Sequence, residues 1–428
     1  MKNLKVTGRY LAYEDGTPFF YLADTAWELL HRGNREEIAY YLRTRAGQKF
    51  TAFQTVLLAE FEGTTVKNSY GRLPLLFTNG LPDPTKPDLS GEYSYWAHVD
   101  YTVKEAEKNG LYAVLLPTWG DKINLGGWGK GPVIFDRDNA YVYGKFLGER
   151  YRGFTNIIWM LGGDREIFGE HRRIIDAIAQ GIKDAGDKHL MTFHPAGCHQ
   201  STEYVGDAAY IDFHTAQTGH ATEQCYKSDE IMRKMAQDTD KPYMDSEPRY
   251  EDHPACFNDS LGCFWGQNEV RQNAYWDVLM GTCGHTYGNH SIWSMTRDTT
   301  SYFPNTWMEV MKHPGAEQMK HLRKLREERD LFSLALCMEA LYANECGMGH
   351  CVAGKGKDYL YAYSPLGLPI HVKLDLFPEA KYLKALWFDP RNGEEKVFAI
   401  LPAEGKTVVV PPTNGQGNDW VLILEAIL

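Results

Sequence analysis

Eight short, mostly apolar stretches recur along the first 330 residues, and most of them are followed by a segment with the composition of a helix. The stretches are continuously apolar rather than alternating, which is typical of strands covered on both faces. They span residues 19–23, 50–60, 111–121, 156–164, 189–197, 210–220, 241–252 and 284–293. Helices are expected over residues 35–48, 95–109, 140–151, 172–185, 229–237, 268–279 and 317–328. This order of elements predicts an α/β fold, a (β/α)8 TIM barrel, in residues 1–330.

A doubly wound open sheet is the alternative for such a series of strands and helices. That fold usually carries a glycine-rich phosphate-binding loop after its first strand. The first predicted barrel strand is instead followed by Ala23-Asp24-Thr25-Ala26-Trp27, which contains no glycine. We therefore favour the barrel.

From residue 331 the pattern changes to short strand-like runs without helical periodicity. These runs cover residues 359–363, 370–374, 382–388, 397–401, 407–410 and 420–424, and turns such as Arg391-Asn392-Gly393 separate them. Residues 331–428 are expected to form a small all-β sandwich domain. Because no Gly/Ser/Pro-rich spacer follows Glu328, we expect this domain to pack on the barrel through apolar surface.

Composition and charge narrow the functional classes. The 428 residues include 45 basic and 56 acidic ones, so the net charge of −11 is unlike that of a general nucleic-acid binder. No apolar run reaches the length of a membrane span. The first ten residues, MKNLKVTGRY, lack the apolar stretch of a signal peptide. We expect a cytoplasmic protein if this N-terminus is native, and an exported one with its signal removed if it is not.

Cysteine and aromatic content point in different directions. All eight cysteines follow residue 197 and none forms a C-x-x-C pair, so we expect mostly buried thiols rather than a zinc ribbon or a redox motif. Aromatic residues reach 13%, with 11 Trp and 26 Tyr. Such a surplus fits carbohydrate binding, because an aromatic ring covers the apolar face of a sugar.

Two predicted strand ends carry acidic side chains that could do chemistry. Barrel enzymes place their reacting groups at the C-terminal ends of the strands. Asp164 ends the fourth strand and Glu247 the seventh, so the two carboxyl groups are expected across the barrel mouth from each other. Glycosidases use such a pair, one carboxylic acid to protonate the leaving oxygen and one carboxylate to attack the anomeric carbon. A structural salt bridge with Arg165 or Arg249 is the simpler interpretation of either acid alone.

Within the seventh strand, the position of Glu247 distinguishes it from its neighbour Asp245. The two residues are two apart and face the same side of the strand. Pro248 interrupts strand pairing directly after Glu247, which lies nearer the mouth. Glu247 is therefore expected to react, and Asp245 to be an inner, structural group.

Histidines suggest a metal-dependent hydrolase as a competing interpretation, since eight of the 15 lie between residues 189 and 290. The first strand has no H-x-H pair, however, and the chain has no H-E-x-x-H motif. We expect no metal and no cofactor, and we expect His194, His214 and His285 to donate hydrogen bonds to sugar hydroxyls or to the carboxylates. The glycine-rich segment 126–131 does not match a phosphate-binding loop and is expected to be a lid that carries Trp128.

Several long motifs occur along the predicted barrel: DTAWELLHR (24–32), LLPTWGDK (115–122), AYVYGKFLGERY (140–151), NIIWMLGGDR (156–165), TFHPAG (192–197), SEPRYEDHP (246–254) and CGHTYGNHSIW (283–293). They resemble glycoside hydrolase family 140, which contains apiosidases acting on the pectin rhamnogalacturonan II. The tail, including WFDPRNGE (387–394), is similar to the small β-sandwich that follows this catalytic domain. The resemblance implies that Asp164 is the acid/base, that Glu247 is the nucleophile, and that the enzyme cleaves between apiose and galacturonic acid.

The expected partner is an oligosaccharide or a pectic polysaccharide, and the oligomeric state is left open. The substrate-binding residues are expected to be Asp24, Trp27, Gln54, Trp119, His194, His214, Gln217, Arg249, His285 and Tyr287. Arg165, Arg249 and Lys122 are candidates to bind the negative charge of pectin. Two other functions stay open: another furanosidase or β-glycanase on the same barrel, such as an arabinofuranosidase, and a catalytically silent carbohydrate-binding protein. The two intact carboxyl groups count against the silent protein.

Overall fold

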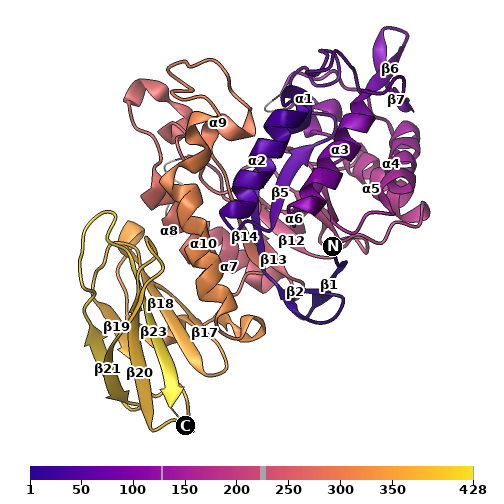
Figure 1. Cartoon of the computed structure of the whole chain (residues 1–428). Helices are drawn as coiled ribbons and strands as arrows, with labels where there is room; N and C mark the ends of the chain where they lie inside the picture. Colours follow the sequence, from indigo (N-terminus) through magenta and orange to yellow (C-terminus); the bar gives the residue numbers. More distant parts are fainter. Residues whose placement is uncertain (127–128, 222–227, 428) are drawn as a thin grey trace.

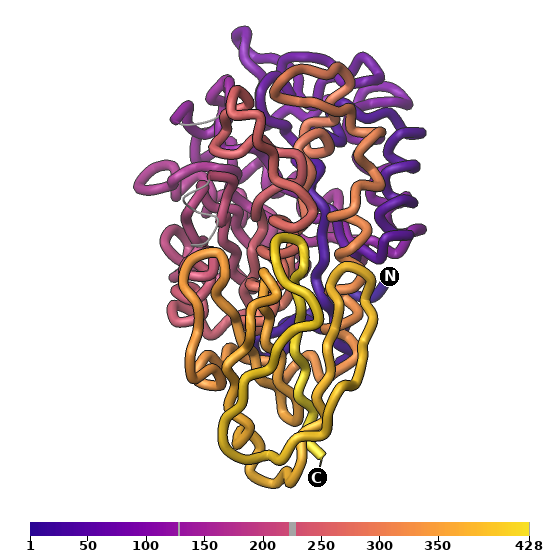
Figure 2. Tube along the Cα trace, turned by 90° about the vertical axis from the view of Figure 1, so that its left-hand side faces the viewer, coloured from indigo at the N-terminus to yellow at the C-terminus, as the bar shows by residue number. Residues whose placement is uncertain are grey.

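A computed structural model describes residues 1–126, 129–221 and 228–427. It contains an N-terminal α/β domain, indigo to orange in Figure 1, and a C-terminal all-β domain, orange to yellow at the lower left. A tube view turned by 90° shows the C-terminal domain at the lower end of the molecule (Figure 2).

A curled sheet of six parallel strands forms the centre of the N-terminal domain, in the order β10-β9-β8-β5-β4-β14. Its strands are β4 (Tyr21–Thr25), β5 (Ala52–Val56), β8 (Tyr112–Leu116), β9 (Ile157–Gly162), β10 (Met191–His194) and β14 (Gly284–Tyr287). Every residue of these six strands is buried, as expected for strands covered on both faces.

The other two predicted strands lie in a second, three-stranded sheet. In it β12 (His214–Gln217) pairs in parallel with β13 (Tyr243–Asp245) and antiparallel with β11 (His199–Gln200). All eight predicted strands therefore occur, but the domain is a half-barrel with a separate parallel pair, where a complete TIM barrel was expected. Beside β10, threonine hydroxyls of Thr192 and Thr215 donate to the carbonyls of Phe213 and Phe193, so side chains supply hydrogen bonds where a ladder would use backbone amides.

Helices follow most of the parallel strands, at the places the sequence predicts. The long helices are α2 (Arg35–Gly47), α3 (Tyr95–Lys108), α4 (Arg137–Tyr151), α5 (Glu170–Asp184), α7 (Ser228–Asp238), α8 (Gln267–Leu279) and α10 (Pro314–Glu327). Short helices are α1 (Leu29–Arg32), α6 (Ser201–Val205) and α9 (His290–Trp293). Asn34 begins α2 with a capping box. Its side chain accepts a hydrogen bond from the backbone amide of Glu37, and the side chain of Glu37 accepts one from the backbone amide of Asn34.

Two antiparallel elements stand apart from the central sheet. The N-terminal sheet contains β1 (Leu4–Thr7), β2 (Tyr10–Tyr13) and β3 (Pro18–Phe19), with a turn at Asp15-Gly16 between β2 and β3. The hairpin of β6 (Leu75–Thr78) and β7 (Leu81–Pro87) lies in the long segment between β5 and α3, where no strand was expected. β7 contains three prolines. Because proline lacks the amide that a strand uses for pairing, the sequence did not predict a strand there.

The C-terminal domain consists of two antiparallel sheets. The larger sheet has the order β15-β17-β18-β23-β20-β21 and the smaller one β16-β19-β22. Its strands are β15 (Ala335–Leu336), β16 (Leu341–Ala343), β17 (Val352–Lys355), β18 (Tyr359–Ser364), β19 (Ile370–Lys373), β20 (Tyr382–Phe388), β21 (Glu395–Pro402), β22 (Lys406–Val409) and β23 (Trp420–Ile427). A cluster of buried residues from both sheets, among them Leu360, Val372 and Leu422, forms the core of this domain.

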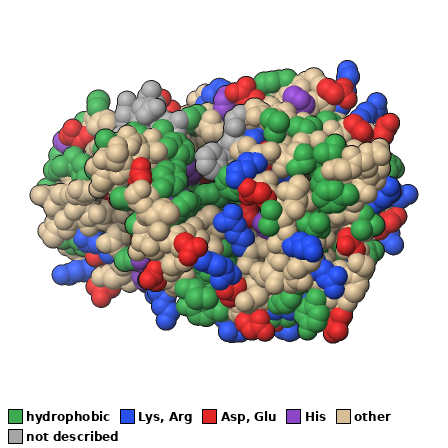
Figure 3. Space-filling view, turned by 90° about the horizontal axis from the view of Figure 1, so that it is seen from above, with side chains coloured by type: hydrophobic (Ala, Val, Ile, Leu, Met, Phe, Trp, Pro, Cys, Tyr) green, Lys and Arg blue, Asp and Glu red, His purple; other side chains and the backbone are tan. Residues whose placement is uncertain are grey.

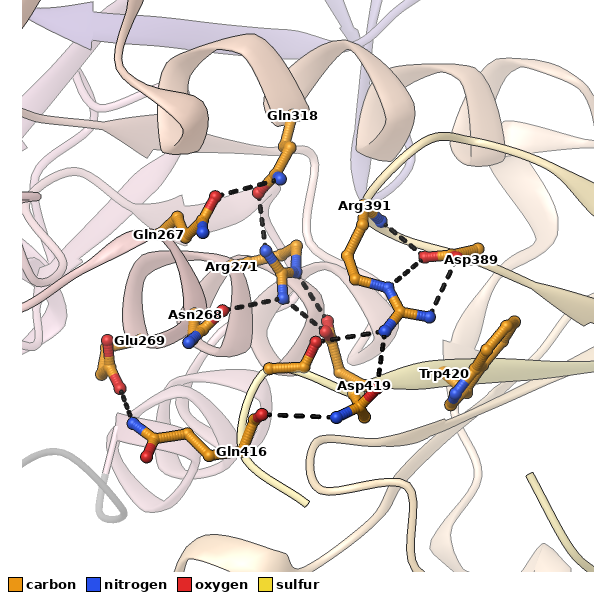
Figure 4. Close-up of polar contacts among 12 residues, drawn as sticks. Gln267, Asn268, Glu269, Arg271, Gln318, Asp389, Arg391, Gln416, Asp419 and Trp420 are labelled. Carbon is orange, nitrogen blue, oxygen red and sulfur yellow. Dashed lines mark hydrogen bonds and ion pairs between the residues drawn. The ribbon is translucent and has the colours of Figure 1, made fainter. Parts of the chain in front are cut away.

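The two domains share a continuous apolar interface, as the lack of a spacer predicts. Tyr361, Tyr363 and Phe388 of the C-terminal domain belong to the same buried cluster as the residues of the α/β core. The ring of Tyr275 in α8 stacks on that of Tyr363, with 5.2 Å between their centroids. Beside these rings, Arg271 of α8 binds Asp419 (Figure 4).

The described cysteines differ from the expectation of mostly buried thiols. Cys283, Cys337 and Cys351 are buried, whereas Cys198, Cys256, Cys263 and Cys346 are exposed. Cys225 lies outside the described residues. No helix in the described part of the chain is both long and apolar enough to cross a membrane.

Candidate active site

A cavity of about 270 Å³ lies where the parallel strands end. The face seen from above in Figure 3 carries interspersed acidic and basic side chains. The cavity is lined by Trp27, Glu60, Trp119, Asp164, Gly197, Cys198, Gln217, Gly219, His220, Glu247, Tyr250, His253, Phe257, His290, Trp293 and Tyr302. Its position matches the C-terminal edge at which parallel α/β sheets bind their ligands.

Glu247 is held by two histidines from neighbouring strand ends. His220 Nε2 lies 3.0 Å from Oε1 of Glu247, and His194 Nε2 lies 3.0 Å from its Oε2. Burial disfavours the charged carboxylate, but the hydrogen bonds from His194 and His220 outweigh burial and lower the pKa of Glu247 to about 2. The side chain is therefore an ionised carboxylate at neutral pH, as a nucleophile requires.

Ser246 orients one of these histidines. Its Oγ lies 3.0 Å from Nδ1 of His194, on the ring edge opposite Glu247. The Ser246 hydroxyl donates its single hydrogen to the Ala216 carbonyl at 2.9 Å, so its oxygen accepts from Nδ1–H of His194. The residue just before Glu247 thus fixes the orientation of the imidazole ring beside the carboxylate.

Asp164 follows β9 on a turn that requires glycine. Gly162 and Gly163 have φ values of 91° and 122°, and Asp164 itself has a φ of 56°. A Cβ on Gly162 would lie 2.3 Å from the carbonyl oxygen of His194. The glycines let the chain pass close to β10 and bring the Asp164 carboxyl to the cavity.

The surroundings of Asp164 favour its protonated form. Burial raises the pKa of Asp164, and the negative charge of Glu247 raises it further, while His194, Arg165 and His220 act in the opposite direction. The two acids therefore have opposite pKa shifts, which is the pattern expected for a proton donor beside a nucleophile.

The three candidate cations do not line the cavity. Arg165 donates to the backbone carbonyls of Asp164, at 2.7 Å, and Asn124, at 3.3 Å. Arg249 Nε donates to Asn273 Oδ1 at 2.6 Å. Lys122 pairs with Asp121 at 2.9 Å. In the described part of the chain, neither Asp164 nor Glu247 forms a carboxylate salt bridge with arginine.

Aromatic rings form the walls around the carboxyl groups. The rings of Trp27 and Trp119 lie 5.2 Å apart, and that of His194 lies 5.3 Å and 5.6 Å from them. On another side His220 stacks on His253 at 4.4 Å. Flat apolar faces next to polar edges suit a sugar ring, whose own faces differ in the same way.

Of the sequence-predicted residues, the structure brings together Asp164, Glu247, Trp27, Trp119, His194 and Gln217. The first four and Gln217 line the cavity, and His194 contacts Glu247. Asp24, Gln54, His214, Arg249, His285 and Tyr287 are not among the lining residues. Gln54 lies between the strands, where it accepts from Tyr21 and donates to the Ser246 carbonyl.

Four of the predicted residues that do not line the cavity have hydrogen-bond or ion-pair partners elsewhere. Asp24 accepts hydrogen bonds from Tyr41 and Arg45 of α2, each at 2.7 Å. His214 is bonded to Ser201 of α6 at 2.8 Å, and His285 lies 3.3 Å from Asp277 of α8. Tyr287 donates to Glu251 at 2.6 Å. Successive side chains of a strand point to opposite faces, and these four are on the faces that look away from the cavity.

Several lining residues were not predicted from the sequence. They include Glu60, His220, Tyr250, His253, His290 and Tyr302. Glu60 and His220 end predicted strands, so the strand-end rule that selected Asp164 could have found them. His253 and Tyr302 come from loops, which carry no such signal.

Two further expectations concern the site. No group of three or more His, Cys, Asp or Glu is arranged to hold a metal ion among residues 1–126, 129–221 and 228–427. Trp128, the expected lid residue, lies outside the described part of the chain.

Comparison with known proteins identifies the family. Residues 5–333 match the family model "Apiosidase-like, catalytic domain", and residues 341–425 match "Putative collagen-binding domain of a collagenase". A search of curated proteins gives no match.

Two similar solved structures are of glycoside hydrolases. The crystal structure of a glycoside hydrolase family 5 protein from Bacteroides vulgatus has 30% sequence identity and a TM-score of 0.90, over 99% of this chain and 94% of that one. A second structure, described as a glycoside hydrolase, has 30% identity and a TM-score of 0.90, over 99% and 97%. A third, a putative glycoside hydrolase from Bacteroides vulgatus, is 13% identical with a TM-score of 0.70 over 100% and 82%, and shares the fold.

Proposed function

Because this chain belongs to the apiosidase-like family of glycoside hydrolases, we propose that it is a retaining glycosidase with Glu247 as nucleophile and Asp164 as acid/base. One observation carries the proposal: two carboxyl groups line a single cavity, and their surroundings shift the pKa of one down and of the other up. Double-displacement glycosidases need this division of roles.

The reaction begins with a sugar bound between the two acids. Glu247 attacks the anomeric carbon while the protonated Asp164 donates its proton to the leaving oxygen, so that the glycosidic bond breaks and an ester to Glu247 forms. The negative charge of Glu247 is consumed in this step. Asp164 is then an ionised base and removes a proton from water, which attacks the ester and releases the sugar with its original configuration.

We propose an apiofuranosyl residue linked to galacturonic acid, as in the pectin rhamnogalacturonan II, as the substrate. The family match and the small size of the cavity support a single sugar residue at this position. Among the described lining residues none is a lysine or an arginine, which favours an uncharged sugar there. The galacturonic acid is then the leaving group, outside the space between the two acids.

A screen of chromogenic furanosides and purified pectin side chains tests this assignment, with Glu247→Gln as the inactive control. We expect release of apiose by the wild-type protein. Release of arabinose alone would assign the chain to another furanosidase. Lack of any sugar release, together with binding of pectin fragments, would indicate a silent carbohydrate-binding protein.

We also propose that the curled sheet and the β12–β13 pair together close a (β/α)8 barrel over residues 1–330, with a sandwich over residues 331–428. Single backbone hydrogen bonds at both junctions support closure. Asp212 N donates to Met191 O at 2.8 Å, and Cys283 N donates to Tyr243 O at 3.0 Å.

A further inference from the structure

Glu60 is a third carboxyl group of the cavity, and the mechanism above does not use it. It lies four residues after β5, lines the cavity, and is only 1% exposed. Its Oε2 is buried and has no hydrogen-bond partner in the protein. A buried polar atom without a partner is costly, so its position at a cavity wall points to a partner supplied by a ligand.

The charged groups that act most strongly on Glu60 are acidic. Glu28, Asp164, Asp121 and Glu247 all interact with it electrostatically and come from four different segments. Arg165 interacts electrostatically with Glu60, but its guanidinium donates hydrogen bonds to the carbonyls of Asp164 and Asn124. In the described part of the chain Glu60 forms no ion pair.

Two of these acids, Glu28 and Asp121, are themselves paired with cations, which are therefore engaged away from Glu60. Arg32 lies 3.3 Å from Glu28, and Lys122 lies 2.9 Å from Asp121. Burial, followed by the negative charges of Glu28, Asp164, Asp121 and Glu247, raises the pKa of Glu60 well above its ordinary value. An ionised Glu60 would add an unpaired buried charge beside the ionised Glu247, whereas a protonated one carries an O–H group that can donate.

We propose that Glu60 stays an uncharged carboxylic acid and donates a hydrogen bond to a hydroxyl group of the sugar bound beside Asp164 and Glu247. This inference rests on the proposed glycosidase function. It assigns Glu60 to substrate binding and leaves proton transfer to Asp164.

The kinetic test compares Glu60→Ala with Glu60→Gln, whose amide can also donate. Glu60→Ala should raise KM about tenfold with a smaller change in kcat, since a bond made throughout the reaction contributes to ground-state binding. Glu60→Gln should recover most of that loss. The loss in Glu60→Ala should be equal on activated and natural leaving groups, unlike the loss of an acid catalyst. Glu62→Gln, in the same loop but paired with Lys130 outside the cavity, is the matched control.

The pH profile distinguishes a neutral Glu60 from a charged one. If Glu60 is neutral, Glu60→Gln leaves the alkaline limb of kcat/KM, set by Asp164, where it is in the wild type. If Glu60 is charged, its removal lowers the pKa of Asp164 and moves that limb to lower pH, which would overturn the proposal. Unchanged kinetics in Glu60→Ala would also overturn it, because Glu60 would then be structural.

A spectroscopic test needs no substrate, so it separates this inference from the glycosidase proposal. The infrared difference spectrum between wild type and Glu60→Gln at neutral pH should contain the C=O band of a protonated carboxyl group. Carboxylate bands in its place would refute the inference even if the protein proves to be an active glycosidase. If the C=O band is present but no glycoside is cleaved, the glycosidase proposal fails while the neutral state of Glu60 stands.

Discussion

Glu247 and Asp164 share one cavity, yet their surroundings favour opposite protonation states. Two imidazole groups reach the carboxylate of Glu247, which is 7% exposed, and keep it ionised. Burial of Asp164 and the negative charge of Glu247 both raise the pKa of Asp164 and favour its protonated form. The catalytic difference between two chemically similar side chains thus comes from neighbours on β10 and after β12.

Removal of His220 should therefore change the pH dependence of catalysis. In the wild type Glu247 stays ionised down to about pH 2, because hydrogen bonds from His194 and His220 outweigh burial. His220→Ala removes one of these hydrogen bonds, so burial should raise the pKa of Glu247. The acid limb of kcat/KM should then move to higher pH by about one to two units. The ionised Glu247 also contributes to the free energy of unfolding above its unfolded pKa, and this contribution is lost as the pH falls through its folded pKa. In His220→Ala the contribution should be smaller.

The measurement is kcat/KM from acid to neutral pH, with His199→Gln as the control. His199 pairs with Glu203 outside the cavity lining, at 2.6 Å, so its replacement should leave the acid limb in place. An acid limb in His220→Ala identical to that of the wild type would contradict the role assigned to His220.

Strand ends and side-chain parity explain what the sequence could predict about the site. Asp164 and Glu247 were predicted because they end apolar strands, and both line the cavity. Asp24 also ends such a strand, but it faces α2, where Arg45 binds it. The direction of the Asp24 side chain depends on Arg45 in the facing helix, and the sequence of the strand alone does not reveal that partner. His253 and Tyr302 join the site through loops, whose paths depend on tertiary packing.

At the scale of elements, the apolar strands and periodic helices could be predicted from the sequence. The separation of the β12–β13 pair from the six-stranded sheet could not. The predicted segments exceed the strands at their ends; residues 241–252, for example, contain only the three-residue β13 (Tyr243–Asp245). Apolar character continues into the loops because these are buried around the cavity. The β6–β7 hairpin was missed because prolines normally argue against a strand.

Helices α4 and α5 pack so closely that glycine is required between them. A Cβ on Gly144 would lie 2.3 Å from the carbonyl oxygen of Ile178 in α5. Gly144→Ala should therefore reduce the free energy of unfolding by about 2–3 kcal/mol, because the helices must separate. Denaturant unfolding monitored by circular dichroism measures this change.

Gly47→Ala is the matched control for that substitution. Gly47 is also helical, at the end of α2, but a Cβ there meets nothing within 4 Å. Alanine is the better helix former, so this variant should gain up to about 1 kcal/mol of stability. Equal effects of the two substitutions would refute the close approach of α4 to α5.

At the scale of the whole molecule, α8 links the C-terminal domain to the site. One of its residues, Arg271, binds Asp419 just before β23, while Asn273 accepts from Arg249, two residues after Glu247. Figure 4 shows further polar contacts across the same interface, including that between Gln416 and Glu269 at 3.0 Å. The C-terminal domain is therefore part of the scaffold that supports the cavity.

Loss of the Arg271–Asp419 pair should destabilise the whole protein. Both side chains are almost completely buried, so Asp419→Ala leaves an unpaired guanidinium and should cost about 3–5 kcal/mol of unfolding free energy. The control Glu170→Ala breaks an exposed pair with Arg173 and should cost at most about 1 kcal/mol. Thermal and denaturant unfolding test this difference, and similar small losses in both variants would contradict an interface held by this pair.

The central claim, retaining hydrolysis by Glu247 and Asp164, is tested most directly by the product that Asp164→Ala forms in the presence of azide. The substrate is an activated glycoside, whose good leaving group needs little protonation, so that the first step proceeds without Asp164. Azide replaces the water that Asp164 would activate, and NMR of the anomeric centre should reveal a glycosyl azide of retained configuration. Glu247→Ala should form no such product. An azide product of inverted configuration in Asp164→Ala, or equal activity of the two variants on the activated substrate, would contradict the assigned roles.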